Sequence, residues 1–250
     1  MNYLNFYRIT FLSLFVILTS CTQSPTNPIL PPPGGDPRIF QKYSKKGFST
    51  LMNGWARGFD MSGVSFNNKR TCTLITPRHV VMARHFKRRP NSQVIFHDRS
   101  GKACIRTITK VENGIGDVAV GLLNQPVPQG YTAYTLPSTS NPENLIGRPI
   151  VVTDQSKNLF FHKIRGIYGN VLRMEYDKDE KHGWGKKLIK GDSGNPSFII
   201  VNNTLVLAET HTTGGPGAGP FYGSREIQES IRQAIQKLDS HYSFKVINID

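Results

Sequence analysis

Ser193 is the residue of this chain best suited to nucleophilic chemistry, because it lies in the run Gly191–Pro196, which reads Gly-Asp-Ser-Gly-Asn-Pro. A serine hydroxyl attacks a carbonyl only when a base takes its proton and N–H donors stabilise the oxyanion that forms. Flanking glycines allow a tight turn that brings bare backbone amides close to a substrate. Such a run also makes ordinary turns, so the partners of Ser193 have to be found elsewhere in the chain.

Two upstream segments offer those partners. His85 follows the apolar run Val80–Ala83, and Asp117 opens an apolar alternation that continues through Val120. A histidine can take the serine proton as a general base, and a carboxylate can hold the imidazole in the tautomer that this transfer needs. We therefore expect His85 to be the base, Asp117 its orienting acid and Ser193 the nucleophile.

Three other residues compete for these roles and fit them less well. His79 comes before the strand-like run and not after it, and neither Asp98 nor Asp154 is followed by a matching strand. We accordingly expect His79 to have a structural role, at the surface or in the core. Arg84 places a positive charge beside His85, which would lower the pKa of the imidazole unless the guanidinium points to solvent.

The order His, Asp, Ser along the chain is the order used by chymotrypsin-type proteases. Leu74–His85 resembles the family's stretch that ends in the catalytic histidine, and Asp117–Val120 resembles its Asp-Ile-Ala-Leu strand. Gly191–Pro196 resembles its Gly-Asp-Ser-Gly-Gly-Pro block, with Asn195 in place of the second glycine after the serine. This resemblance to trypsin-like serine proteases covers residues 47–238. It implies an all-β fold of two six-stranded antiparallel β-barrels, with a C-terminal α-helix packed on the second barrel.

The resemblance also implies how the oxyanion is held. The backbone N–H groups of Gly191 and Ser193 would form the oxyanion hole. Asp192 would not act on the substrate but would pair with a buried cation that shapes the hole, and Arg148 is our candidate for that cation. Cleavage after Arg38, in a segment that faintly resembles an activation site, is the alternative source of such a charge.

Three residues of the substrate pocket also follow from the resemblance. Lys187, six residues before the nucleophile, holds the position that often lines the pocket floor. Thr210–Gly215 resembles the substrate strand of glutamate-specific bacterial relatives, in which a histidine, here His211, binds the acidic side chain. Gly214 would belong to a flexible rim. Lys187 and His211 would suit an acidic residue before the scissile bond. In the alternative interpretation, Lys187 points to solvent and His211 packs within its strand.

The elements that must position these residues are mostly strands. Between residues 48 and 223, short apolar-alternating runs are separated by Gly, Pro, Asn and Asp, a pattern typical of barrels and sandwiches. The expected strands are Thr71–Thr76, Gln93–His97, Ala103–Val111, Val118–Leu122, Ile150–Thr153, Phe160–Tyr168, Asn170–Tyr176, Pro196–Val201 and Thr204–Thr210, with a tight turn at Asn202-Asn203.

The domain plan follows from the same pattern. The protease-like domain would span residues 47–240, with barrels at about 47–125 and 148–223 separated by a proline-rich stretch. Apolar residues at helical spacing, from Ile227 to Leu238, predict a helix over 225–238. Residues 241–250 would form a tail.

The N-terminal residues resemble a bacterial lipoprotein signal. Residues 1–20 contain Arg8 and an apolar run over Ile9–Leu18 that is short for a membrane span. Leu18–Cys21 resembles a lipobox, which implies that Cys21 carries lipid. An ordinary signal peptide with a chance cysteine is the alternative. Residues 21–46 form a proline-rich linker. We expect a secreted protein anchored by lipid in the cell envelope, at the outer membrane if the host is Gram-negative.

The charge composition limits the classes of partner that we expect for this protein. The 250 residues contain 31 Lys plus Arg against 17 Asp plus Glu, a net charge of +14. This excess either forms a solvated surface or attracts an anionic surface. No nucleic-acid-binding motif accompanies it. We expect a monomer whose partners are a protein or peptide substrate and, through the lipid, a membrane.

Cysteine and histidine usage adds two further expectations. If Cys21 is lipidated, Cys72 and Cys104 remain, and they are either a disulfide or two buried free thiols. The seven histidines and the remaining cysteines show no zinc-type spacing, and no phosphate-binding glycine motif is present. We therefore expect no metal and no cofactor.

These observations favour a serine endopeptidase that acts through a His85-Asp117-Ser193 triad and an acyl-enzyme. A catalytically silent module that binds a surface is the alternative from another class. An esterase using the same site would differ only in substrate.

Overall fold

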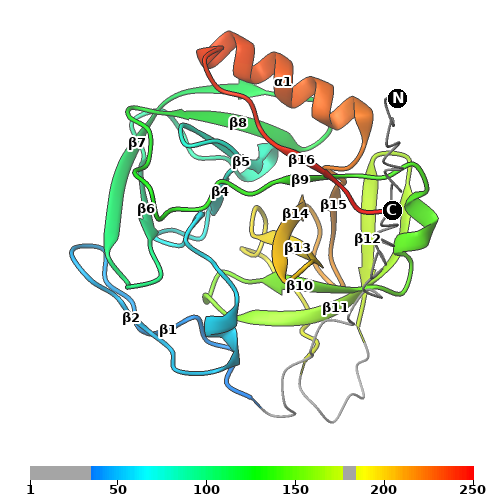
Figure 1. The fold of residues 1–250 in the computed structure, drawn as a ribbon, viewed down its shortest axis with the longest axis horizontal. Helices are drawn as coiled ribbons and strands as arrows, with labels where there is room; N and C mark the ends of the chain where they lie inside the picture. Colours follow the sequence, from blue (N-terminus) through cyan, green and yellow to red (C-terminus); the bar gives the residue numbers. More distant parts are fainter. Residues whose placement is uncertain (1–34, 177–183) are drawn as a thin grey trace, which may run out of the picture.

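The computed structural model describes residues 35–176 and 184–250, and its described part is mostly β-structure with one α-helix near the C-terminus (Figure 1). Most strands belong to two six-stranded sheets, each antiparallel throughout. One sheet curls almost into a closed barrel and the other into a half-barrel. The all-β, two-barrel fold class expected from the sequence is confirmed.

The first sheet has the strand order β3-β4-β5-β8-β7-β6. Its strands are β3 (Val64–Ser65), β4 (Cys72–Leu74), β5 (His79–Ala83), β6 (Gln93–His97), β7 (Ala103–Asn113) and β8 (Val118–Leu123). The two edge strands approach each other, because the amide of Ile95 in β6 donates to the Ser65 hydroxyl in β3 over 3.1 Å. Ala83, the last residue of β5, pairs with Val118, the first of β8. The segments just beyond this pair therefore lie side by side.

The second sheet has the order β14-β13-β10-β11-β12-β15. Its strands are β10 (Pro149–Thr153), β11 (Leu159–Tyr168), β12 (Val171–Glu175), β13 (Pro196–Val201), β14 (Thr204–Thr210) and β15 (Ala218–Pro220). Asn202 and Asn203, with φ of 48° and 60°, make the tight turn expected between β13 and β14.

Buried apolar side chains join the two sheets into one body. One cluster, around Phe96, fills the first sheet, and another, around Ile150, fills the second. The largest cluster combines residues of both sheets, such as Val81 and Phe198. A site that draws residues from both sheets is therefore held by a shared core.

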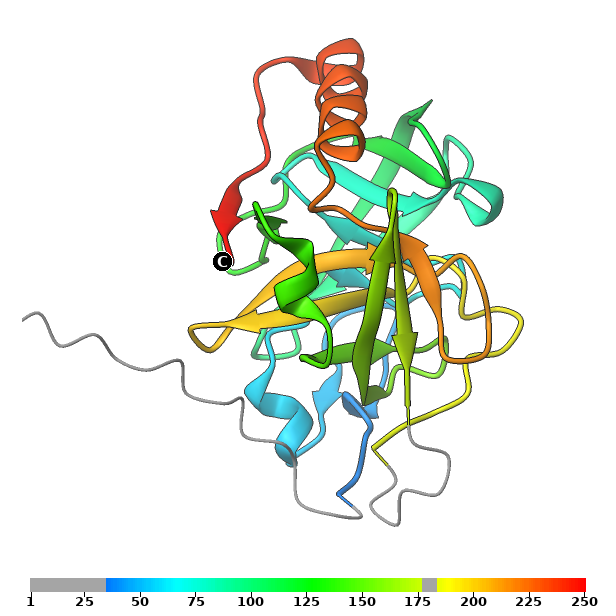
Figure 2. The ribbon, with the colours of Figure 1, turned by 90° about the vertical axis from the view of Figure 1, so that its right-hand side faces the viewer.

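Helix α1 (Arg225–Asp239) forms where the sequence predicts it but packs on the other sheet. Ser224 caps its first turn by accepting from the Ile227 amide. The buried stripe that includes Ile231 belongs to one cluster with Val118 of β8, and α1 contacts β7 and β8 (Figure 2). The expectation that the helix packs on the second barrel is wrong. Helical spacing identifies an apolar stripe but does not identify the surface that it covers.

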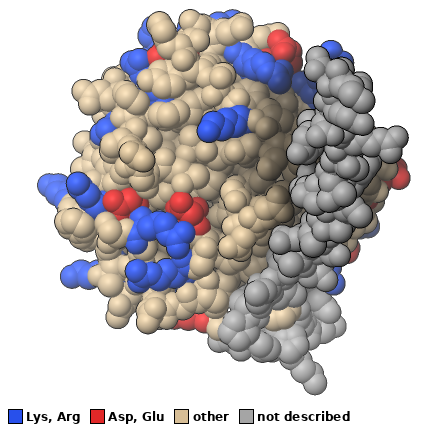
Figure 3. Space-filling model, viewed as in Figure 1, with Lys and Arg blue, Asp and Glu red and all other residues tan. Residues whose placement is uncertain are grey.

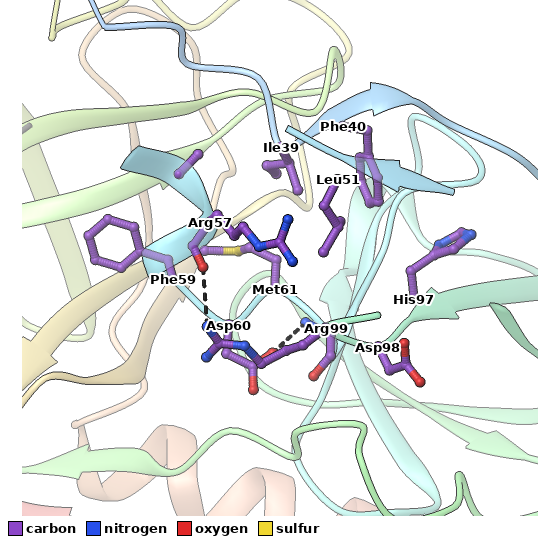
Figure 4. A pocket seen from close by; sticks show the side chains of 12 residues that line it. Ile39, Phe40, Leu51, Arg57, Phe59, Asp60, Met61, His97, Asp98 and Arg99 are labelled. Atoms are coloured by element: carbon purple, nitrogen blue, oxygen red, sulfur yellow. Dashed lines mark hydrogen bonds between the residues drawn. The ribbon is translucent and has the colours of Figure 1, made fainter. Parts of the chain in front are cut away.

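The N-terminal part of the fold begins earlier than residue 47. Strand β1 (Phe40–Lys42) pairs with β2 (Thr50–Leu51), and Ile39 is buried. The segment covers a cavity of about 30 Å³, also bordered by Met61 and by the 3₁₀ helix η1 (Trp55–Gly58) (Figure 4). That volume suits roughly one water molecule. Residues 39–46, expected to be linker, are therefore part of the packed domain.

The C-terminal tail is also packed. Strand β16 (Val246–Asn248) runs parallel to β9 (Leu136–Ser138), in the stretch that connects the two sheets. A 3₁₀ helix, η3 (Pro142–Leu145), follows β9. The side chain of Asp250 accepts from the Ser140 amide over 3.0 Å. The tail thus fastens the connection between the sheets.

The expected features of the N-terminal segment fall largely outside the described part of the chain. The signal peptide, the lipidated Cys21 and the linker up to residue 34 lie outside the described residues. In the described part of the chain, no helix is long and apolar enough to span a membrane.

Cys72 and Cys104 are buried free thiols in the core of the first sheet, so the disulfide alternative is not what the structure contains.

Candidate active site

His85, Asp117 and Ser193 lie in one chain of hydrogen bonds. The Nε2 atom of His85 is 3.0 Å from the Ser193 Oγ, and its Nδ1 atom is 2.7 Å from the Asp117 Oδ2. The imidazole is about half exposed, while the carboxylate is largely covered. A base that contacts the nucleophile and is itself oriented by a carboxylate is the arrangement that activates a serine.

Strand pairing places the base beside its acid. The 3₁₀ helix η2 (Arg84–Phe86) follows β5 directly, and Asp117 comes just before β8. Because β5 and β8 are antiparallel, the end of one meets the start of the other. The Arg84 amide donates to the Asp117 carbonyl over 3.0 Å, and the His85 amide donates to the Asp117 Oδ1 over 2.8 Å. The local backbone therefore holds the two side chains in register.

Thr212 adds a third donor to this carboxylate. Its hydroxyl donates to the Asp117 Oδ2 over 2.8 Å, in addition to the amide and ring nitrogen of His85. Thr212 lies just after β14 of the second sheet, so this bond links the two sheets at the site. Thr212 could not be identified as a site residue from the sequence, because nothing in its neighbourhood sets its hydroxyl apart from those of Thr210 and Thr213.

Ser193, the candidate nucleophile, directly follows a tight turn. The amide of Asp192 donates to the carbonyl of Ile189 over 3.0 Å, and Gly191 at the third position of this turn has a φ of 105°. That positive φ favours glycine. Among the described residues, the amides of Gly191 and Ser193 donate to no protein acceptor. Both are available to a developing oxyanion, as the resemblance implies.

Backbone amides, and not the expected buried cation, contact the carboxylate of Asp192. Its buried carboxylate accepts from the amides of Ile189 (2.8 Å) and Gln155 (3.1 Å), and the described residues place no cation in contact with it. Arg148 instead donates to the carbonyl of Ile249 over 3.3 Å. The expectation that Arg148 pairs with Asp192 is therefore wrong. The backbone amides of two segments take the place of that cation.

Gln155 holds the peptide between Lys190 and Gly191, whose amide is one of the two candidate oxyanion donors. Its side-chain Nε2 donates to the Lys190 carbonyl over 3.1 Å. In a trans peptide the next N–H, that of Gly191, points in the opposite direction from this carbonyl. A Cβ on Gly191 would lie only 2.5 Å from the Gln155 Oε1, so a larger residue at position 191 would displace the Gln155 side chain. No local pattern identifies Gln155 as a site residue, because it lies 38 residues before Ser193 in the chain.

Asn195 ties the nucleophile loop to the first sheet. Its Oδ1 accepts from the Thr71 hydroxyl over 2.9 Å, and its Nδ2 donates to the Asp192 carbonyl over 3.0 Å. The side chain is fully buried. The departure from the family block at this position is therefore a cross-link between the segment before β4 and the loop that carries Ser193.

His79 and Arg84 do not compete with His85. His79 is fully buried in β5, and its Nδ1 is 2.9 Å from the Thr76 hydroxyl. Burial lowers the pKa of His79 to about 4, so its imidazole is neutral at neutral pH. Arg84 is exposed and directs its guanidinium to the carbonyl of Gly114, 3.4 Å away.

The two other aspartates considered from the sequence have local roles. Asp154 is buried and pairs with Lys186. Asp98 closes a turn by accepting from the amides of Ser100 and Lys102, both over 2.9 Å. Neither aspartate belongs to the triad.

Lys187 and His211 lie in contrasting environments. Lys187 is exposed, whereas His211 is buried, with its Nε2 3.0 Å from the Thr153 carbonyl and its Nδ1 2.7 Å from the Glu209 carboxylate. The latter contact is an ion pair without the angular geometry of a hydrogen bond. Both ring nitrogens are engaged by the protein, which argues against direct recognition of an acidic substrate by His211.

The surroundings of the buried His211 side chain shift its pKa in opposing directions. Burial alone would lower the pKa of His211, but the Glu209 carboxylate and the Thr153 carbonyl outweigh it and raise the pKa above its ordinary value. Asp192 contributes in the same direction. The Glu209 carboxylate beside His211 therefore favours the protonated form of this buried imidazole.

Gly214 lies against the opposite wall of the expected pocket. A Cβ there would be 2.9 Å from the Leu188 carbonyl, and Leu188 exchanges two backbone hydrogen bonds with Gly215, of 2.8 and 2.9 Å. The two segments expected to form the pocket walls are thus paired by backbone bonds at this point.

An apolar cavity of about 360 Å³ borders the triad. Asp117 and Thr212 form part of its wall, together with Ile115, Val171 and Ile227. Neither Ser193 nor His85 lines this cavity, so it adjoins the candidate triad only at the acid.

Among the described residues, no group of three or more His, Cys, Asp or Glu side chains could hold a metal ion. No protein-family model and no curated protein matches this chain.

Proposed function

We propose that this protein is a serine endopeptidase. The observation that supports the proposal best is the chain of hydrogen bonds from Ser193 through His85 to Asp117, with distances of 3.0 and 2.7 Å. Two unoccupied amides beside the nucleophile, those of Gly191 and Ser193, complete the set of groups that acyl transfer requires.

The reaction would proceed in two halves. In the first, His85 Nε2 takes the Ser193 proton while Oγ bonds to the scissile carbonyl carbon, and the amides of Gly191 and Ser193 hold the oxyanion. The imidazolium then gives this proton to the leaving amine, and an acyl-serine ester remains. In the second half, His85 takes a proton from water, the resulting oxygen nucleophile attacks the ester, and the proton returns to Ser193 as the acid product leaves.

Asp117 would stabilise the imidazolium without taking its proton. Its carboxylate keeps the Nδ1–H directed away from the nucleophile, so that Nε2 is the basic nitrogen facing Ser193. The Thr212 hydroxyl and the His85 amide fix the carboxylate in turn. Removing the acid while keeping its shape typically costs about 10⁴ in turnover.

Labelling with a fluorophosphonate probe tests the assembled site. The purified protein should be labelled, and the matched Ser193→Ala variant should not be. Equal labelling of both proteins would place the reactive group elsewhere. A folded protein that takes no label, even after brief trypsin treatment, would instead be a silent module.

Cleavage products distinguish an endopeptidase from an esterase. Incubation with a denatured protein and mass spectrometry of the fragments should reveal internal peptide bonds cut in a Ser193-dependent manner. Hydrolysis of ester reporters with no peptide fragments would contradict the endopeptidase proposal while leaving the triad intact.

The proposed enzyme would act at the cell envelope. This part of the proposal is supported by Cys21 and the apolar run before it, with a proline-rich spacer between the lipid and the domain. A tethered protease would cut substrates that come close to the membrane surface.

A further inference from the structure

A cationic groove of about 540 Å³ runs along the first sheet. Five basic residues line it and no acidic residue does: Lys45, Lys46, Arg70, Arg88 and Arg89. The face in Figure 3 shows basic side chains in separate small groups, one of them bordered by acidic side chains. The groove, defined below by these five residues, is a concave surface whose charged lining residues are all basic.

The base of the groove carries a buried charge. Arg88 is only 4% exposed, and its guanidinium donates to the carbonyls of Arg70 (2.6 Å) and Gln93 (2.7 Å) and to the Asn67 Oδ1 (2.7 Å). All three acceptors are neutral. A buried guanidinium without a carboxylate keeps its full charge in a poorly screened place, which favours an anion nearby.

The exposed cations of the groove also lack a carboxylate partner among the described residues. Within the described residues, Lys45, Lys46, Arg70 and Arg89 form no ion pair. Other arginines of this protein do find carboxylates, as Arg78 does with Asp239 at 2.6 Å. Four unpaired cations around a fifth, buried one form a field that an acidic ligand would lower in energy.

The groove begins one aromatic ring away from the base of the triad. The guanidinium of Arg70 lies over the Phe86 ring, 5.2 Å from its centroid, and Phe86 stacks against His85 at 6.1 Å between ring centroids. The apolar cavity, by contrast, borders Asp117 at the Nδ1 edge of the imidazole. Two different surfaces therefore lead away from the reacting atoms.

The chemistry of the reaction decides which half of a substrate meets the groove. Nε2 of His85 hands its proton to the leaving amine, so the leaving half of the peptide has to run past the imidazole. The route past Phe86 reaches Arg70 first. Ile105, which is 40% exposed, lies along the same groove and offers an apolar contact to a peptide side chain or stem.

We propose that this groove binds acidic side chains on the leaving-group side of a peptide substrate. The inference rests on the proposed endopeptidase function and adds a substrate class to it: peptides with Asp or Glu a few residues after the scissile bond. A peptide fits because it is continuous with the reacting chain, and because its side chains can reach both the cations and Ile105.

Two matched peptide libraries test this preference. Both have the same randomised residues before the scissile bond and alanine after it, followed by either three glutamates or three glutamines. We expect kcat/KM to be about tenfold higher for the glutamate library at low salt, because exposed charge pairs are individually weak but act together. The preference should shrink at 0.5 M NaCl, where charges are strongly screened.

Two double variants that each remove two positive charges test whether the groove causes the preference for glutamate. In the Lys45→Gln, Arg70→Gln double variant, the ratio of kcat/KM for the glutamate library to that for the glutamine library should come close to one. Lys163→Gln with Lys237→Gln removes the same charge from exposed sites on β11 and α1 and should preserve the preference. Equal cleavage of both libraries by the unmodified protein would overturn the proposal, as would an equal loss of preference in both double variants.

A binding measurement separates this proposal from the proposed function. Fluorescently labelled hexaglutamate should bind the Ser193→Ala protein in a salt-sensitive manner and bind the Lys45→Gln, Arg70→Gln form of that protein less tightly. This result supports the groove even if the unmodified protein takes no fluorophosphonate label, which would refute only the enzyme. Binding of a sulfated polysaccharide or anionic vesicles without hexaglutamate binding would overturn the peptide assignment.

Discussion

Gln155 provides the sharpest test of how the oxyanion hole is held. Its Nε2 donates to the Lys190 carbonyl over 3.1 Å, while its backbone amide independently donates to Asp192 over 3.1 Å. Gln155→Leu keeps a similar volume and the backbone bond but removes the side-chain donor. The peptide between Lys190 and Gly191 is then free to rotate its N–H out of the hole.

The expected magnitude follows from the single bond that is lost. A neutral hydrogen bond contributes about 0.5–1.5 kcal/mol net. If this contribution is realised when the oxyanion forms, kcat should fall by about two- to tenfold with little change in KM. Complete loss of the Gly191 amide sets an upper limit of about 10²–10³. Gln155→Glu should be worse than Gln155→Leu, because a carboxylate would face the Lys190 carbonyl.

Steady-state kinetics on one cleaved peptide would measure both parameters, with Gln233→Leu on the surface of α1 as a matched control. A peptide boronate, which mimics the tetrahedral intermediate, should lose affinity in parallel with kcat. A rise in KM with unchanged kcat would refute the reasoning, because it would assign Gln155 to substrate binding. Loss of activity matched by loss of folded protein in a thermal melt would refute it too.

Three further predictions follow. Thr212→Val removes a 2.8 Å bond to the Asp117 carboxylate, so kcat should fall by about tenfold or more; an unchanged kcat would show that the acid is oriented without it. Burial lowers the pKa of His79 and of His162 to about 4. Both therefore bind fewer protons when folded than when unfolded between about pH 6.5 and 4, and the free energy of unfolding should fall across that window as the pH drops, by roughly 1–3 kcal/mol for each. Denaturant melts at pH 7 and pH 4.5 would measure this, and a His162→Gln protein should lose less; equal stability at both pH values would contradict it. Cys21→Ala should move the protein from the membrane fraction to the soluble fraction on fractionation of cells, and an unchanged distribution would reject the lipid anchor.

The residues of the candidate site were largely predictable because they sit in local context. His85 and Asp117 each adjoin an apolar strand, and Ser193 lies in a glycine-flanked turn, so short stretches of sequence carry the signal. The same holds for the elements. Alternation and turn residues predicted Gln93–His97, Pro196–Val201 and Thr204–Thr210 with the bounds that the structure has.

The supporting contacts were not predictable from any such stretch. Gln155 reaches the oxyanion loop, Asn195 reaches Thr71, and Thr212 reaches Asp117 across sequence separations that no local pattern records. Each depends on how two strands or two sheets come together. The predicted pairing of Asp192 with Arg148 was wrong for this reason. The sequence shows that an acid and a cation are both present, but it does not show that backbone amides such as that of Ile189 donate to the Asp192 carboxylate.

What the sequence by itself predicted about this protein is the kind of most of the longer elements, their bounds to within about two residues, and the three residues proposed as a triad, because these depend on neighbours along the chain. Only the tertiary structure decided which sheet α1 covers, that Ile39 and Phe40 belong to the core, and that five cations gather in one groove beside Phe86. Those properties depend on burial and on contacts between distant segments, and such contacts exist only once the two sheets have packed together.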